Sequence, residues 1–79
     1  MKAKIYITLK AGVLDPQGKA VEHSLHNLGF EGVTGVRQGK YMEIELATED
    51  KTKAEADLDE MCKKLLANIV IENYRIELE

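Results

Sequence analysis

The sequence of 79 residues has one cysteine, one proline and no tryptophan, and its aromatic residues are three tyrosines and one phenylalanine. The lone Cys62 cannot form a disulfide within the chain, and an unpaired thiol is typical of a reducing compartment, so we expect a cytoplasmic protein. Few aromatic residues and a net charge of −3 argue against a nucleic-acid partner. No apolar run approaches the roughly 20 residues that span a bilayer, so no membrane partner is expected.

The length of the chain indicates a single domain covering residues 1–79. A core in so short a chain supplies little net stability, and such domains are usually reinforced by disulfides, a structural metal or self-association. The sequence offers no disulfide and no evident set of metal ligands. We therefore expect a homo-oligomer, either a dimer or a dimer of dimers.

Hydrophobic periodicity predicts the element order β-α-β-β-α-β. The predicted strands cover residues 2–10, 33–38, 41–47 and 70–78, and the predicted helices cover residues 16–28 and 52–67. Asp15 is the expected N-cap of the first helix, accepting from the amide of Gly18, and Pro16 suits its first position. Thr52 and Glu55 have the spacing of a capping box at the second helix. A turn at Gln38-Gly39-Lys40 would join the two middle strands as a hairpin.

This order favours an α+β fold of the ferredoxin-like type, with a four-stranded antiparallel sheet and both helices on one face. The first strand would lie beside the third. Lys4 and Lys10 would then face the neighbourhood of Glu43 and Glu45 across the other, open side of the sheet, which also carries Tyr6 and Tyr41. That mixture of charge and aromatic rings suits either water or a protein partner.

A search for catalytic or metal-binding groups finds no convincing constellation. Cys62 lies on the predicted apolar stripe of the second helix, which favours core packing over reactivity. His23 and His26 share the exposed side of the first helix, but two histidines fall short of the three or four ligands of an organised metal site. The sequence therefore predicts no catalytic, cofactor-binding or metal-binding residue.

Several sequence blocks resemble the PurS family, the small subunit of bacterial and archaeal phosphoribosylformylglycinamidine (FGAM) synthase. The most specific block is Leu-Asp-Pro-Gln-Gly-Lys-Ala at residues 14–20. Leu-Gly-Phe at 28–30, Val-Arg at 36–37 with Gly-Lys at 39–40, and Asn68 with Val-Ile-Glu-Asn-Tyr at 70–74 follow in order. The resemblance spans essentially the whole chain. One departure is Ile69, where the family often has proline, and it affects only the stiffness of the turn before the last strand.

The resemblance implies a non-catalytic subunit in the fourth step of purine biosynthesis. It would bridge a PurQ-type glutaminase subunit and an ATP-dependent PurL-type synthetase subunit and assist ammonia transfer between them. ATP and magnesium would belong to the synthetase, and this chain would have no cofactor of its own. The residues in the matching blocks are candidates for the partner interface: Asp15, Pro16, Gln17, Gly18, Lys19, Arg37, Gly39 and Lys40. For the caps and glycines among them, local structure is an equally good explanation.

An alternative is a regulatory module of the ACT type, which has the same element order and senses small molecules near a helix start. Its first loop usually places proline and glycine side by side, whereas here Gln17 separates Pro16 from Gly18. Such modules are also usually fused to a catalytic domain. Both features favour the PurS resemblance.

Overall fold

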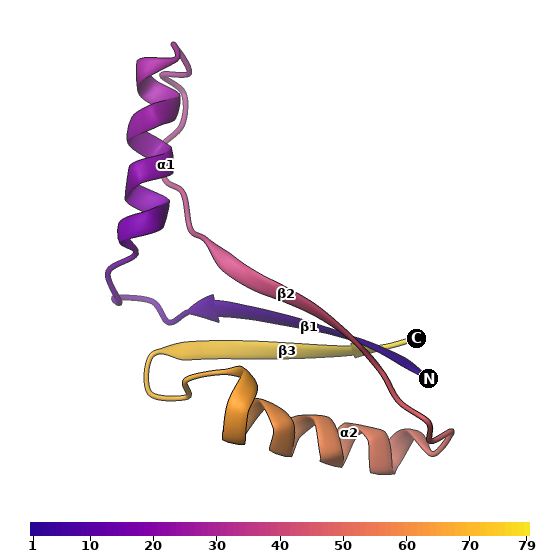
Figure 1. Ribbon diagram of the computed structural model, residues 1–79. Helices are drawn as coiled ribbons and strands as arrows, with labels where there is room; N and C mark the ends of the chain where they lie inside the picture. The colour runs from indigo at the N-terminus through magenta and orange to yellow at the C-terminus, as the bar shows by residue number, and fades with distance from the viewer.

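The computed structural model describes residues 1–79 as three strands and two helices (Figure 1). In chain order these are β1 (Lys2–Leu9), α1 (Pro16–Asn27), β2 (Gly39–Glu45), α2 (Lys51–Met61) with a π-helical turn η1 (Cys62–Leu66), and β3 (Glu72–Leu78). The predicted α+β class is confirmed. Neither helix has the length and hydropathy needed to cross a membrane.

The sheet has three strands in the order β2-β1-β3, so the expectation of four strands is wrong. Both outer strands run antiparallel to β1, with Lys4 opposite Glu43 and Tyr6 opposite Tyr41. The predicted pairing of the first strand with residues 41–47 is therefore correct. Because both outer strands run antiparallel to β1, they are parallel to each other, and only the β2-α2-β3 connection is a crossover.

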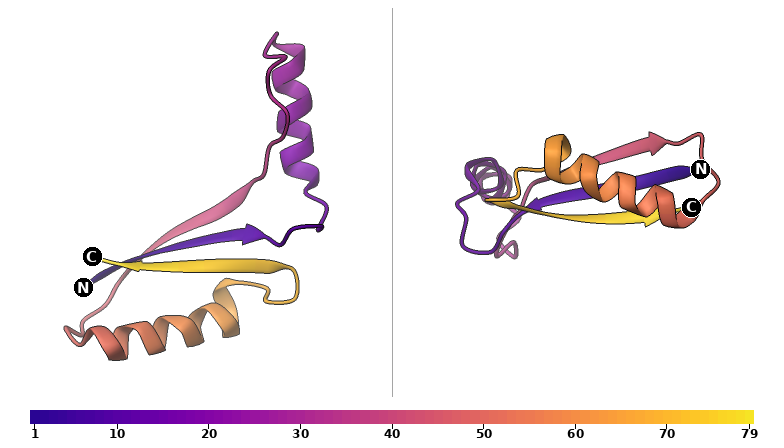
Figure 2. Two further views of the ribbon diagram at one scale, coloured as in Figure 1. Left: turned by 180° about the vertical axis from the view of Figure 1, so that it is seen from behind. Right: turned by 90° about the horizontal axis from the view of Figure 1, so that it is seen from below.

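Residues 33–38 were expected to form the missing strand of a hairpin, but they run back along α1 as an irregular segment (Figures 1 and 2). Their backbone groups are held by side chains instead of a neighbouring strand. The carbonyl of Val33 accepts from His26, and the amide of Gln38 donates to Asp15. Gly35 also weakens the strand tendency of this stretch. Gly39 then continues directly into β2, so the predicted turn at residues 38–40 does not form.

Helix α1 and the returning segment form a projection from the sheet, which we call the arm (residues 16–38; Figure 2). The radius of gyration is 16.0 Å, whereas a compact chain of this length would have about 12 Å. The expectation that both helices cover one face is therefore wrong, since only α2 lies on the sheet. The physical reason is that α2 already covers the inner residues of β1.

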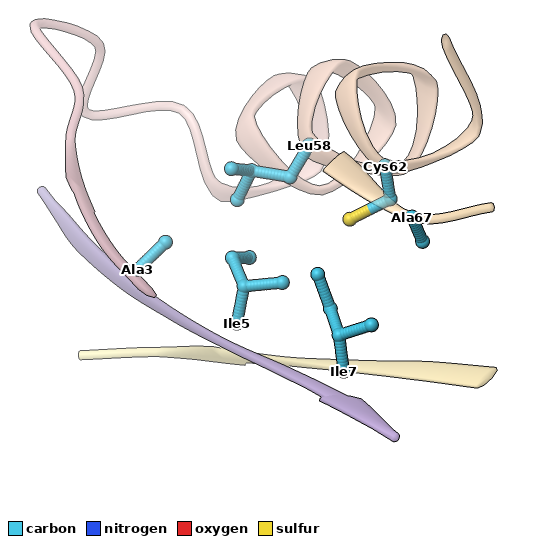
Figure 3. Close-up of a cluster of buried hydrophobic side chains, with 6 residues drawn as sticks. All are labelled: Ala3, Ile5, Ile7, Leu58, Cys62 and Ala67. Carbon is cyan, nitrogen blue, oxygen red and sulfur yellow. The ribbon is translucent and has the colours of Figure 1, made fainter. Parts of the chain in front are cut away.

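The core lies between the sheet and α2 (Figure 3). Its six buried residues are Ala3, Ile5, Ile7, Leu58, Cys62 and Ala67. The first three are the alternating inner positions of the predicted first strand. Cys62 is fully buried, as the apolar-stripe interpretation predicts, and desolvation raises the pKa of its thiol. That thiol is uncharged at neutral pH and is a packing group.

The helix ends show which sequence signals determine the caps. Asp15 accepts from the amide of Gly18 at 2.8 Å, as predicted. The second helix begins one residue earlier than expected because Asp50, which accepts from the amide of Lys53, is its N-cap. The Thr52–Glu55 capping box is therefore wrong. A carboxylate oxygen supplied by Asp50 already satisfies an open amide of the first turn.

Residues 1 and 79 lie side by side at the end of the sheet that is remote from the arm (Figure 1). The N-terminal ammonium of Met1 donates to the carbonyl of Leu46 at 2.9 Å, and the amide of Glu79 donates to the carbonyl of Lys2 at 3.0 Å. The Lys4 ammonium also pairs with the Glu79 carboxylate at 2.7 Å. Both ends of the chain are thus tied to the sheet.

Candidate functional site

The predicted interface residues gather where the chain enters and leaves the arm. We call this region, residues 9–19 and 37–40, the neck. It contains all eight candidates: Asp15, Pro16, Gln17, Gly18, Lys19, Arg37, Gly39 and Lys40. The fold thus brings together two sequence blocks that are about 20 residues apart in the chain.

Asp15 is the buried polar centre of the neck, with 5% of its surface exposed. Its carboxylate accepts from the amide of Gln38 at 2.7 Å and from the amide of Gly18 at 2.8 Å. These two donors, with a contribution from the charge of Arg37, hold the pKa of the carboxyl below its ordinary value. The side chain therefore does more than cap α1, because it also ties the returning segment to the start of the helix.

Arg37 connects the second segment of the neck to the first. Its guanidinium donates to the carbonyls of Val13 at 3.0 Å, Lys10 at 3.1 Å and Leu9 at 3.4 Å. Together these bonds fasten the returning segment to the loop that leaves β1. Arg37 therefore has an architectural role, because its side chain joins the two segments of the neck, and its place in a partner interface stays a prediction.

Two glycines in the neck are required by close backbone approaches. A Cβ on Gly18 would lie 2.4 Å from the carbonyl oxygen of Val36, and a Cβ on Gly39 would lie 2.4 Å from the carbonyl oxygen of Ile7. Real Cβ atoms do not approach backbone oxygens so closely. Gly18 thus lets the returning segment lie against α1, and Gly39 lets β2 begin against β1. The turn role predicted for Gly39 is wrong.

Two shallow clefts flank Asp15. One, of about 380 Å³, is lined by residues that include Lys19, Glu22 and Arg37. The other, of about 210 Å³, is lined by residues that include Gln17, Lys40 and Glu72. Lys19 pairs loosely with Glu22 at 3.6 Å, and Lys40 with Glu72 at 3.5 Å. Both lysines keep more than half of their side-chain surface exposed, so they remain available to a partner.

The open face of the sheet satisfies its own charges, as the sequence indicated. Lys2 pairs with Glu43 at 3.0 Å, and the Tyr6 hydroxyl donates to Glu77 at 3.1 Å. The Arg75 guanidinium lies 4.1 Å from the centre of the Tyr6 ring, a cation–π geometry. The pKa of Glu43 is held below its ordinary value, chiefly by its hydrogen bond to Lys2. This network leaves little unmatched charge on the face.

The arm carries a contact of His26 that no sequence pattern indicates. His26 Nε2 lies 2.7 Å from the carbonyl oxygen of Val33, and because a carbonyl only accepts, the ring nitrogen must be the donor. His26 therefore holds the tip of the arm together. No group of three or more histidine, cysteine, aspartate or glutamate side chains could hold a metal ion. Only the three-dimensional path of residues 33–38 reveals the histidine's partner.

The apolar side chains of the arm are largely uncovered. Val21 is 42% exposed, Leu28 73% and Phe30 57%. The predicted fold placed the first helix on a face of the sheet, but the arm projects away from the sheet (Figure 2). These exposed apolar side chains are available for contact with another protein.

Comparison with known proteins gives one consistent family. The PurS family model, described as phosphoribosylformylglycinamidine (FGAM) synthase, matches residues 2–79. The chain is 52% identical to phosphoribosylformylglycinamidine synthase subunit PurS of Bacillus subtilis, covering 99% of this chain and 92% of the relative. It is 44% identical to the subunit of the same name from Methanocaldococcus jannaschii, covering 99% and 94%.

Solved structures agree with these matches. The B. subtilis PurS structure superimposes with a TM-score of 0.90 at 51% identity, covering 99% of this chain and 96% of that one. A chain in the structure of PurLQS from Thermotoga maritima superimposes with a TM-score of 0.87 at 32% identity, covering 96% and 93%. These matches decide against the ACT-type alternative.

Proposed function

The chain belongs to the PurS family and is a subunit of FGAM synthase in purine biosynthesis, and we propose that it acts there as a non-catalytic bridge between two other subunits. The partners would be a PurQ-type glutaminase and a PurL-type synthetase. The observation that carries this proposal is the match along nearly the whole chain to a component of the T. maritima PurLQS structure. A bridging subunit acts through the surfaces that contact its partners, and this role requires no reactive group.

The side chains of this protein support a positioning role. The Cys62 thiol is buried and its pKa is raised, so it is a poor nucleophile. The Asp15 carboxylate is occupied by two backbone amides. Ammonia release and the ATP-dependent step would therefore use residues, ATP and magnesium held by the partner subunits.

The neck supplies the side chains best suited to partner contact. Gln17, Lys19 and Lys40 are exposed beside the two clefts, whereas Asp15, Gly18, Arg37 and Gly39 already serve the neck itself. Pro16 begins α1 at the same surface. Charge reversal at Lys19 therefore probes the interface more cleanly than removal of Arg37, which would also loosen the arm.

Self-association would use the arm. Its exposed stripe needs cover, and the inner side chains Met42 and Ile44 of β2 are only partly buried by this chain's own elements. The arm of one copy laid on the β2 side of a second copy's sheet would cover both surfaces. Such a contact is isologous, since each copy gives an arm and receives one. Pairing through the free edges of β2 and β3 is a second route, because both edges carry unpaired backbone groups.

The decisive assay is FGAM formation by the synthetase and glutaminase subunits with and without this protein. We expect glutamine to support turnover only when the chain is present, and free ammonia to support turnover by the synthetase without it. A glutamine-dependent rate that does not change on adding the chain would overturn the bridging role.

The neck is tested in the same assay with Lys19→Glu. We expect this variant to need at least tenfold more protein for half-maximal glutamine-dependent activity. Lys53→Glu is the matched control, since it makes the same charge change at an exposed position on α2. Equal behaviour of the two variants would exclude Lys19 from the interface.

A further inference from the structure

A third cleft lies at the end of the sheet nearest the arm, where β1 ends beside the start of β3 (Figure 1). Its volume is about 430 Å³. We call it the lysine cleft, and the residues that line it are Lys10, Lys63, Ile69, Glu72, Asn73 and Tyr74. The end of β1, the turn η1, the loop after it and the start of β3 thus bring side chains from distant parts of the sequence to one hollow.

Lys10 is a partly buried cation for which the chain provides no counter-ion. It is the only lysine or arginine that is partly buried and forms no ion pair, since the other partly buried lysines, Lys2 and Lys4, each pair with a glutamate. Two bonds fix its backbone, because its amide donates to the carbonyl of Ile71 at 2.8 Å and its carbonyl accepts from Arg37 at 3.1 Å. A charge that is partly removed from water is normally paired. Lys10 is therefore placed to bind an anion from outside the chain.

Lys63 and Asn73 add two more donors to the lysine cleft. The Lys63 ammonium lies 2.8 Å from one carboxylate oxygen of Asp59, and the other oxygen accepts from the Tyr74 hydroxyl at 2.5 Å. Asp59 does not line the cleft, so it orients the lysine from behind. The Asn73 side chain is exposed and can donate through its amide group.

Glu72 is the one acidic residue in the lining, and its charge is already balanced. One of its carboxylate oxygens accepts from the amide of Asn68 at 2.7 Å, and the other lies 3.5 Å from the Lys40 ammonium. Only 13% of the side chain is exposed. The groups left to meet a ligand in the cleft are thus two ammonium groups and one amide, which favours a ligand with more than one negative charge.

From these contacts we propose that the lysine cleft binds the phosphate group of a small molecule. A phosphate monoester presents three strong acceptor oxygens and close to two negative charges at neutral pH, which match two ammonium groups and one amide donor. Ile69, which is 49% exposed, supplies an apolar wall beside them. Free phosphate and a phosphate ester share this chemistry, and only the ester also contacts the wall. The site lies within one chain and does not rest on the bridging role.

Titration of the isotope-labelled full chain, followed by NMR at constant ionic strength, tests the site. With ribose 5-phosphate we expect saturable shifts of the amide signals of Ile69 and Asn73, with a dissociation constant of about 1 mM or lower. Inorganic phosphate is the second probe. Tighter binding of the ester supports a site that uses the apolar wall, and equal affinity supports a site that recognises the phosphate group alone. Acetate, which carries one charge, should bind at least about tenfold more weakly.

Three variants separate the cleft from general surface charge. Lys10→Gln should weaken phosphate binding at least about tenfold, because it removes the unpaired cation. Lys53→Gln is the matched control, since it removes the same charge from an exposed lysine without an ion pair, and it should leave the affinity nearly unchanged. Glu72→Gln should tighten binding about threefold, because it removes the nearest negative charge and keeps an oxygen for the amide of Asn68. Circular dichroism checks that each variant is folded.

Three results would overturn the proposal. The first is the absence of saturable shifts with either phosphate probe up to about 10 mM. The second is equal weakening by Lys10→Gln and Lys53→Gln, which would show attraction to surface charge in general. The third is weaker binding by folded Glu72→Gln. Failure of the bridging role would appear only in the glutamine-dependent assay, which none of these titrations uses.

Discussion

Dilution is the simplest perturbation that tests whether the arm is covered by a second copy. Only nine of the 79 residues are buried in the single chain, while Leu28 and Phe30 on the arm are mostly exposed. If two copies fold and unfold together, mass action makes the melting temperature depend on protein concentration. A monomer would melt at one temperature at every concentration.

The size of the effect follows from the length of the chain. Unfolding absorbs about 0.7 kcal/mol of enthalpy per residue near 60 °C, so unfolding two chains of 79 residues absorbs about 110 kcal/mol. A tenfold dilution changes the free energy of a dimer by about 1.4 kcal/mol. Together these values predict a fall in melting temperature of about 4–5 °C for each tenfold dilution. Differential scanning calorimetry between about 5 and 500 µM protein measures this slope.

Two variants test whether the concentration dependence of the melting temperature comes from contacts of the arm. Leu28→Lys places a cation at the C-terminal end of α1, which an isolated helix tolerates well, but it removes an apolar contact from the proposed interface. Asn27→Lys introduces the same charge at the neighbouring exposed position. We expect the first to lower the melting temperature and flatten the slope, and the second to leave both nearly unchanged. A melting temperature independent of concentration in the unmodified protein would refute the reasoning.

Three further predictions concern the single chain. Leu58→Ala, at a fully buried position, should lower the free energy of unfolding by about 2–5 kcal/mol in urea titrations, whereas Val70→Ala, at an exposed one, should change it by less than about 0.5. Gly39→Ala should cost about 1–3 kcal/mol because its Cβ meets a backbone oxygen, and an unchanged urea midpoint would contradict that. The folded-state pKa of Asp15 lies below the ordinary 3.8, so its stabilising effect is complete above that value and is lost as pH falls through the folded pKa. The difference in urea midpoint between the unmodified protein and Asp15→Asn should therefore shrink below about pH 4, and a constant difference would exclude this linkage.

Local patterns in the sequence were sufficient to predict an element where the pattern itself lies within a few residues. The alternation around Ile5 and Ile7 identified the central strand, and Asp15 with Gly18 identified the start of α1. The family resemblance rested on blocks of residues that include Asp15 and Gly18, and the match over residues 2–79 confirms it.

The predictions were wrong where side chains distant in the sequence bind backbone groups that a strand would otherwise use. Residues 33–38 have the composition of a strand, yet Asp15 and His26 bind their amide and carbonyl groups, so no fourth strand forms. The element order predicted that the first helix packs on the sheet, but a sequence pattern cannot say whether a helix is covered by its own chain or by another. The second helix was predicted as one uninterrupted α-helix over residues 52–67, whereas Cys62–Leu66 form a π-helical turn.

The placement of the two chain ends makes this protein a candidate for circular permutation. Residues 1 and 79 are held at the same end of the sheet by hydrogen bonds to Leu46 and Lys2, so a short glycine-rich linker can join them without strain. New ends could be opened at Gly32, at the exposed tip of the arm, where an added Cβ would meet no neighbouring atom. Such a permutant would keep every strand pairing while dividing the arm between its two ends. Its stability would therefore show how much of the folding free energy the sheet supplies when the arm is no longer one continuous segment.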